Sequence, residues 1–484
     1  MPPEIRKLSH LQTLMYFRVG GKEGRQIKEL GFLKNLTGKL DIHNLELVNG
    51  REEAKKADFV EKPKIYKLVF LEGNNDKSVL EGLQPHPNLK SITIKGFRST
   101  NFPSWTMKME LFLDLIEINF LNCRNCVEIP MFGHLRFLKY LTLDNLTNHS
   151  FVQTEFNFRN REEQFPFSIS YKRLILKNMP NLTEWAGAEV MPVVEARTCR
   201  EQVFPCLEVL EIENGPKLKT FPSHFPCLKK LEINIIDDFL LRKILSSGNL
   251  TSLEKLSIME ISTLTSLIPH LKECQKYLRN LIIMNCEKLR ELPEDLHSFR
   301  SLESLTIIGC RSLQSISYQS GQKGPPSLRW LDIFGCSELS CLPSEMTESI
   351  RFSKSIGYNS FQAALDNIQQ SKSLCRLNLY GWEHEDLLPY QLQHLTLLES
   401  ISLIGFGIEA LPEWFGGLSS LSRLNLMDCQ KLRHMPSKEA MERLTKLEHL
   451  CVLNCPLLQE RCWEERGPDS EWSKISHIPN IVGL

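Results

Sequence analysis

Residues 278–313 read LRNLIIMNCEKLRELPEDLHSFRSLESLTIIGCRSL, and one apolar spacing occurs twice in them. Apolar side chains stand at the first, fourth and sixth positions and a cysteine at the ninth, as in LxxLxLxxC, and the first copy continues with xxLxxLP. Cys286 and Cys310 are 24 positions apart. The central LxL alternates with period two, so both of its apolar side chains point to one face of a short strand.

The same spacing recurs along most of the chain. Clear copies also begin at Leu328, Leu421 and Leu447. Weaker copies begin at Leu11, Ile65, Leu89, Leu115, Leu138, Tyr171, Leu207, Leu228, Leu253, Leu374 and Leu398. Two repeat lengths separate Leu328 from Leu374, so we expect one more degenerate repeat near Ile350.

A single copy cannot bury its apolar face, so copies must stack on one another. The cysteine is expected to turn the chain inward as a small buried group, and the proline to end any short helix on the outer side. We therefore predict an α/β repeat fold, a leucine-rich-repeat solenoid. It would be a curved horseshoe with a parallel sheet on the concave face and short helices and loops on the convex face.

The spacing of the copies also suggests boundaries. We expect N-terminal leucine-rich repeats in 1–185, an inserted loop in 186–206, C-terminal leucine-rich repeats in 207–458 and a cap in 459–484.

The composition excludes several classes of protein. Lys+Arg and Asp+Glu both number 58, so the net charge of +0 lacks the basic excess of a nucleic-acid binder. No run of 18 apolar residues predicts a membrane span. The opening residues do not resemble a signal peptide. We therefore expect a cytoplasmic, intracellular protein whose 15 cysteines are free thiols.

Candidate chemistry is sparse. Cys123 and Cys126 have the spacing of a zinc or redox pair, but Cys123 occupies the turn position of its repeat and no second pair follows. Gly405-Phe406-Gly407 with Ala410 resembles a dinucleotide fingerprint, yet the repeat already explains these residues. No phosphate loop of the form GxxxxGK[ST] and no GxSxG elbow occurs. We expect no catalytic residues, no cofactor, no metal and no enzymatic activity.

The column that follows the second core residue is the candidate site. It begins with residues such as Lys95, Asp144 and Glu213, then becomes apolar for eight successive recognisable repeats. Contiguous exposed apolar side chains usually mark an interface, and aromatic residues are typical hot spots. Two alternatives would also explain the column: a strand register displaced by one residue, or a concave face that another domain covers. The predicted partner-binding residues are Met259, Met284, Ile308, Phe334, Tyr380, Ile404, Met427 and Leu453, joined by Trp330 from a column two positions earlier.

Several longer stretches resemble a known family, the coiled-coil branch of plant intracellular nucleotide-binding leucine-rich-repeat (NBS-LRR) disease resistance proteins. They are the opening residues 1–48, VLEGLQPHPNLKSITIKGFRSTNFPSW at 79–105, MPNLTEW at 179–185 and CPLLQERCWEERGPDSEWSKISHIPNI at 455–481. The resemblance implies a repeat domain that senses a pathogen effector or a host target (a guardee) and restrains the receptor's nucleotide-binding domain. The coiled-coil and nucleotide-binding (NB-ARC) modules of that family are not recognisable in these residues, so nucleotide binding is assigned to none of them.

Two other functions compete with a sensor of plant defence. Leucine-rich-repeat substrate adaptors of ubiquitin ligases also use cysteine-type repeats, but theirs resemble CxxITDxGL rather than CxxLxxLP. Extracellular plant receptors have repeats that resemble NxLxGxIP, which is absent here.

Overall fold

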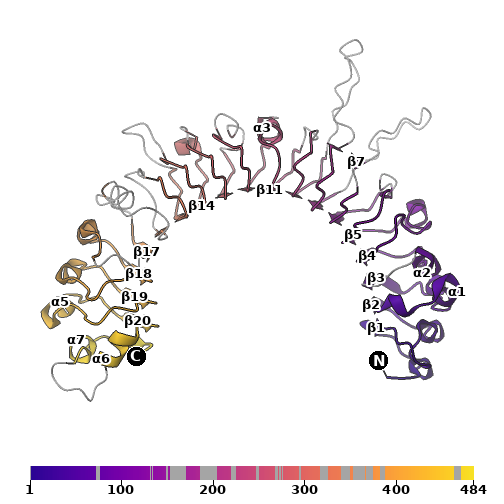
Figure 1. Ribbon diagram of the computed structural model, residues 1–484, viewed down its shortest axis with the longest axis horizontal. Helices are drawn as coiled ribbons and strands as arrows, with labels where there is room; N and C mark the ends of the chain where they lie inside the picture. Colours follow the sequence, from indigo (N-terminus) through magenta and orange to yellow (C-terminus); the bar gives the residue numbers. More distant parts are fainter. Residues whose placement is uncertain are drawn as a thin grey trace, which may run out of the picture. The chain divides into compact units, whose positions relative to one another are not determined.

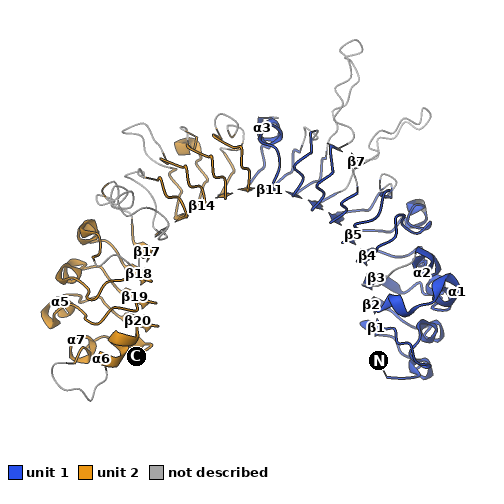
Figure 2. Ribbon diagram, viewed as in Figure 1, with its two compact units in different colours: residues 1–253 blue, residues 254–484 orange. Residues whose placement is uncertain are grey.

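The chain is described by a computed structural model (Figure 1). The described residues are 2–71, 77–130, 132, 135–148, 151–152, 171–185, 204–219, 225–246, 250–267, 271, 274, 276–293, 296–316, 325–339, 349–352, 366, 374–381, 387–462 and 470–484. They form two compact units, 1–253 and 254–484 (Figure 2). In each unit the strands line one side, and the helices and 3-10 turns lie on the opposite side.

The strands of the first unit pair in parallel with the strand of the neighbouring repeat. In the order of pairing they are β1 (Tyr16–Arg18), β2 (Gly38–His43), β3 (Ile65–Leu71), β4 (Ser91–Lys95), β5 (Glu117–Leu121), β6 (Tyr140–Asp144), β8 (Arg173–Lys177), β10 (Val209–Glu213) and β11 (Lys230–Asn234). Two further short strands, β7 (Phe151–Val152) and β9 (Glu184–Trp185), pair with each other.

The second unit repeats this arrangement, again with parallel neighbours. Its strands are β12 (Lys255–Met259), β13 (Asn280–Met284), β14 (Ser304–Ile308), β15 (Trp330–Phe334), β16 (Ser349–Phe352), β17 (Arg376–Tyr380), β18 (Ser400–Ile404), β19 (Arg423–Met427), β20 (His449–Leu453) and β21 (Asn480–Val482).

The other side of each unit carries short helices. The α-helices are α1 (Gly50–Lys55), α2 (Lys77–Gly82), α3 (Asp238–Ser246), α5 (Lys438–Glu442), α6 (Pro456–Arg461) and α7 (Trp472–Ile475). The 3-10 turns are η1 (Ile5–Lys7), η2 (Ile27–Phe32), η3 (Leu45–Leu47), η4 (Phe59–Glu61), η5 (Met109–Leu111), η8 (Leu296–Ser298), η9 (Tyr390–His394) and η10 (Glu413–Gly417). Both units are leucine-rich-repeat solenoids, which confirms the predicted fold class.

The core is built from the two apolar positions of each strand. Leu281 lies opposite Leu256 on one side and Leu305 on the other, and all three are fully buried. The degenerate repeat expected near Ile350 is confirmed, because this buried residue lies opposite Leu331 and Leu377. Like core positions therefore stack from repeat to repeat.

Two details of the N-terminal repeats differ from the prediction. The spacing that begins at Leu11 would place Tyr16 in the core, but the structure buries Phe17 there and leaves Tyr16 exposed, so the register was wrong by one residue. The strand β2 was missed, although Leu40 and Ile42 alternate correctly, because no leucine stands three positions before Leu40.

In many repeats the turn after the strand is made by a left-handed residue, which stands just before the cysteine where the repeat has one. Asn285 and Gly309 have φ values of 54° and 69°, in the left-handed region that glycine and asparagine tolerate best. The Asn285 amide donates to the carbonyl of Ile308, 2.7 Å away, which extends the parallel ladder by one bond. Cys286 fills the space behind this turn as a buried thiol, but it does not make the turn.

The prolines begin outer turns and do not end them, contrary to expectation. Pro389 and Pro412 are the N-caps of η9 and η10, and Pro456 opens α6. A helix start suits proline because its fixed φ is already helical and no amide is needed there.

A buried carboxylate fastens the C-terminal cap to the repeats. Glu471 accepts hydrogen bonds from the Met435 amide at 2.9 Å and from Lys474 Nζ at 3.1 Å, and it lies 3.0 Å from Nδ1 of His434. Burial alone would raise the pKa of Glu471, but the hydrogen bonds from His434, Lys474 and the Met435 amide outweigh burial and lower it. The charged carboxylate therefore holds α7 beside α5.

We predict that acid loosens this cap. A carboxyl group whose pKa is lowered by folding stabilises the folded state above its unfolded pKa of about 4.5. That contribution is lost as the pH falls through the lower, folded pKa. The α7 amides should lose hydrogen-exchange protection over that range in the wild type, when protection is measured relative to an unstructured peptide at the same pH. In Glu471→Gln they should already be poorly protected at neutral pH, and strong protection that does not change with pH in this variant would contradict the assignment.

The register can be tested with two adjacent isoleucines. Ile307 is fully buried and Ile308 is half-exposed on the opposite face of β14. Ile307→Asp should unfold the neighbouring repeats, because burying an unpaired charge costs several kcal/mol. Ile308→Asp, with the same chemical change, should shift the melting temperature only slightly. Equal shifts for the two variants would show that the register is incorrect.

Candidate functional site

Eight of the nine predicted binding residues form one row on the strand side of the second unit. Each is the last residue of its strand, and Met284 lies opposite both Met259 and Ile308. Ile308 in turn lies opposite Phe334. We call this set the apolar row: Met259, Met284, Ile308, Phe334, Tyr380, Ile404, Met427 and Leu453. All of its side chains are half-buried or exposed.

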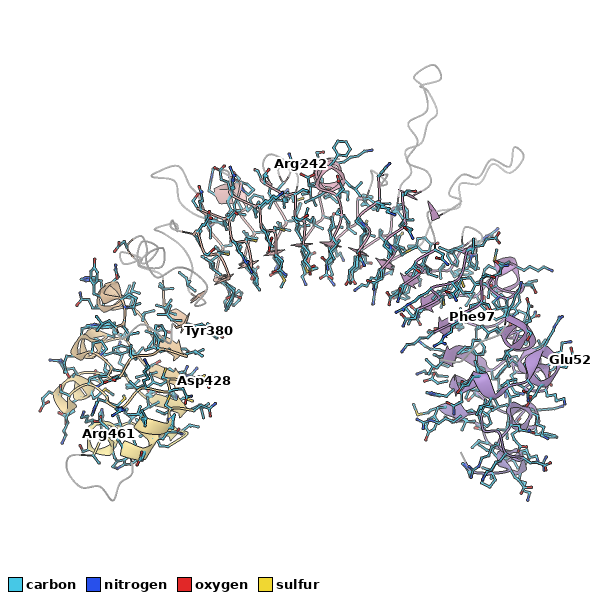
Figure 3. All side chains as sticks on the ribbon, in the orientation of Figure 1. Glu52, Phe97, Arg242, Tyr380, Asp428 and Arg461 are labelled. Atoms are coloured by element: carbon cyan, nitrogen blue, oxygen red, sulfur yellow. The ribbon has the colours of Figure 1, made fainter. Side chains whose placement is uncertain are left out.

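An aromatic contact joins the two halves of the row. The strand β16 ends at Phe352, opposite Ile333, so it has no residue opposite Phe334. The Phe334 ring instead contacts the Tyr380 ring edge-on, with the ring centroids 5.5 Å apart. From Tyr380 the row continues without a break through β18 and β19 to Leu453, whose side chain is 41% exposed. Figure 3 shows Tyr380 on the strand side of the unit.

Trp330 does not belong to the row. It is the first residue of β15 and Phe334 is the last, so four positions separate them and not two as expected. The side chain of Trp330 is 39% exposed and stands in the column formed by the first residues of the strands. An alternating strand presents its first, third and fifth residues on one face, so both residues still face solvent.

The middle residues of the strands form a column between the column of Trp330 and the apolar row. In β17–β20 the side chains of this middle column are small and polar, apart from a cysteine. It consists of Asn378, Ser402, Asn425 and Cys451. The Asn425 side chain donates to the Ser402 hydroxyl at 2.9 Å, so these groups satisfy one another along the sheet. The face is therefore an apolar surface bordered by a polar strip.

The strand side of the first unit has a different character. Lys177 lies 3.3 Å from Glu211 and 3.2 Å from Glu213, and Lys230 lies 3.0 Å from Glu211 and 3.1 Å from Glu232. Burial would raise the pKa of Glu211, but hydrogen bonds from Lys230 and Lys177 outweigh it and lower the pKa. Lys177 and Lys230 are therefore compensated by carboxylates of the same unit.

In a second charged cluster of the first unit, the charges are again compensated by neighbouring groups of the same unit. Glu117 accepts hydrogen bonds from Lys67 at 2.8 Å, from Ser91 at 2.6 Å and from Asn119 at 3.1 Å. Burial opposes ionisation, but these bonds bring the pKa of Glu117 to about 2. Because its donors are already engaged, the cluster is a structural part of the sheet.

The two motifs that suggested other chemistry lie in the core. Cys123 and Cys126 are fully buried free thiols, and burial raises the pKa of Cys123 to about 12 and that of Cys126 as well. Phe406, in the glycine-rich stretch, is also buried. Among the described residues, no three or more His, Cys, Asp or Glu side chains are grouped so that they could hold a metal ion.

Gly381, next to the apolar row, accommodates the Phe406 ring. A Cβ atom at position 381 would lie 2.3 Å from that ring, whereas one at Gly417 would meet nothing within 4 Å. Gly381→Ala should therefore lower the free energy of unfolding by about 1–3 kcal/mol through overpacking. Gly417→Ala is the matched control and should change it little. Denaturant unfolding of both variants checks this, and equal stabilities would contradict the packing.

Comparison with known proteins agrees with this architecture. Residues 27–146 match the family model described as R13L1/DRL21 LRRs. RPP13-like protein 1 of Arabidopsis thaliana is 28% identical over 68% of this chain and 30% of its own length. The chain matches the leucine-rich-repeat region of plant disease resistance proteins. RGA1 of Solanum bulbocastanum is 32% identical over 61% of this chain and 28% of its own length, and the disease resistance protein RGA2 of the same species is 30% identical over 60% and 27%.

The chain thus spans less than a third of the length of these relatives. A solved leucine-rich-repeat protein of Leptospira interrogans aligns with 94% of this chain and 92% of its own, at 16% identity and a TM-score of 0.34. None of the helices in the described part of the chain is long and apolar enough to cross a membrane.

Proposed function

We propose that this chain is the sensor domain of a plant intracellular disease-resistance protein, and that it recognises a protein partner through the apolar row. The partner would be a pathogen effector, a host target or the nucleotide-binding domain of the same receptor, and its binding would regulate defence signalling in the cytoplasm. The observation that carries the proposal is the apolar row itself, eight large apolar side chains that end the strands β12–β15 and β17–β20 and remain half-buried or exposed. The resistance proteins among the relatives support the biological setting.

The row has the composition of a binding surface. The fold does not need these side chains, because the core positions Leu379, Leu403 and Leu426 are already fully or almost fully buried beneath the sheet. Large apolar groups at the solvent-facing positions therefore expose surface that a partner would cover. Phe334 and Tyr380 lie near the middle of the row, where aromatic side chains contribute most to protein–protein affinity.

The proposal predicts that a charge in the row removes a partner without unfolding the protein. Phe334→Asp should abolish the recovery of specific proteins with the tagged chain from plant leaf cells, while its melting temperature stays within a few degrees of wild type. The control is Tyr390→Asp, since Tyr390 is 58% exposed in η9, on the helix side of the same unit. Proteins that bind the wild type and the control but not Phe334→Asp are the expected result.

Two results would contradict the proposal. If Phe334→Asp and Tyr390→Asp recover the same proteins as the wild type, the row is not the recognition surface. If Phe334→Asp melts far below the wild type, its ring belongs to the core and the surface assignment is incorrect.

A further inference from the structure

Two arginines flank the apolar row, and among the described residues no carboxylate forms an ion pair with either of them. Arg376 and Arg423 are the first residues of β17 and β19, and both are exposed. Ser400 lies between them in the sheet, and His449 follows Arg423 on β20. We call Arg376, Arg423 and His449 the basic column. The basic column was not predicted from the sequence. Its two arginines open the stretches RLNLY at 376–380 and RLNLM at 423–427.

Among the described residues, no carboxylate compensates the charges of Arg376 and Arg423. The strands β17–β20 contain no Asp or Glu. Glu399 and Glu448 stand just before β18 and β20, but among the described residues no ion pair joins them to Arg376 or Arg423. Asp428 lies beyond the apolar row, where it accepts a hydrogen bond from Asn454 at 3.0 Å. In the first unit, by contrast, Lys177 and Lys230 each contact two carboxylates.

The spacing of this surface matches one kind of ligand. The basic column and the apolar row are separated by four residues of extended strand, about 13 Å. Arg376 and Arg423 are two strand spacings apart, about 10 Å. An α-helix is about 10 Å wide and places residues i and i+7 about 10.5 Å apart along its axis. A helix lying across the strands could therefore meet both arginines with two side chains seven positions apart.

We infer that the strand side of β17–β20 binds an acidic amphipathic helix of a partner protein. Apolar side chains of the helix pack on Tyr380, Ile404 and Met427, and Asp or Glu residues spaced seven apart pair with Arg376 and Arg423. The polar column of Asn378, Ser402 and Asn425 lies under the helix between these two contacts. The inference rests on the proposed function of the same surface and specifies the chemistry of its partner.

The surface and the proposed ligand are complementary in charge. Arg376 and Arg423 form no ion pair with another described residue, so none of those contacts has to be broken when an acidic ligand approaches. Charges at the edge of an interface chiefly select partners and speed their association, whereas buried apolar anchors supply most of the affinity. The two contacts should therefore be separable by mutation.

The test is a selection from a displayed library of helical peptides with randomised surface positions, using the full chain as bait. Enriched peptides should carry Asp or Glu seven positions apart beside a stripe of large apolar residues. Binding of an enriched peptide, measured by fluorescence anisotropy, should be lost in Tyr380→Asp. It should weaken about tenfold or more in the double variant Arg376→Glu/Arg423→Glu, and it should also weaken with added salt.

Two controls make the charge effect specific. The double variant Lys438→Glu/Arg443→Glu changes the charge equally on α5, on the helix side of the same unit, and should bind as the wild type does. A peptide with its acidic residues replaced by Lys should bind the wild type poorly and regain affinity for Arg376→Glu/Arg423→Glu. Melting temperatures of all variants should remain close to that of the wild type.

The outcomes separate this inference from the proposed function. If peptides are enriched without an acidic preference but still depend on Tyr380, the basic column has no role and the inference is overturned, while the apolar row remains a binding surface. If no peptide is enriched, or if binding survives Tyr380→Asp, the inference is also overturned. The recovery experiment with Phe334→Asp then decides independently whether the row binds a protein.

Discussion

Stacking of identical backbone registers is the constraint on which this structure depends. One repeat contributes only two core side chains from its strand, such as Leu281 and Ile283, and cannot bury them alone. Parallel pairing places like positions opposite one another, so each repeat completes the core of the next. A left-handed residue follows many of the strands and keeps the ladder continuous into the turn, which is why asparagine and glycine recur there.

The same pairing decides what faces solvent. The side chains of a strand point alternately to its two faces, so a five-residue strand with two side chains in the core directs the other three to the opposite face. Like positions of neighbouring repeats then form columns along the sheet. In the first unit these columns hold lysines and glutamates that neutralise one another. In the second unit the last column is apolar, and the arginines of the first column form no ion pair with another described residue. What the sheet presents to solvent therefore depends on the outward residues, although the inward residues determine where they stand.

Much of this could be read from the sequence, since the LxL alternation at residues such as Leu305 and Ile307 specifies both the strand and its buried face. The repeat at β2 escaped detection because it begins at Thr37 and lacks the leading leucine. The first repeat was placed one residue out because Leu11 and Leu14 are only half-buried. The row could be predicted from alternation alone. The Phe334–Tyr380 contact could not, because it depends on where β16 ends. Nor could the lack of an ion pair between Arg376 and the other described residues, because it depends on neighbours across the sheet.

The separation of inward and outward positions has a consequence for how such a surface changes over generations. A substitution at Tyr380 or Arg423 changes what the sheet presents to solvent, while the leucines beneath continue to hold the fold together. The exposed positions of the strands are thus sites at which variation is nearly free of a stability cost. The scaffold can explore new specificities one side chain at a time, and a lineage of such proteins could follow a changing target without passing through misfolded intermediates.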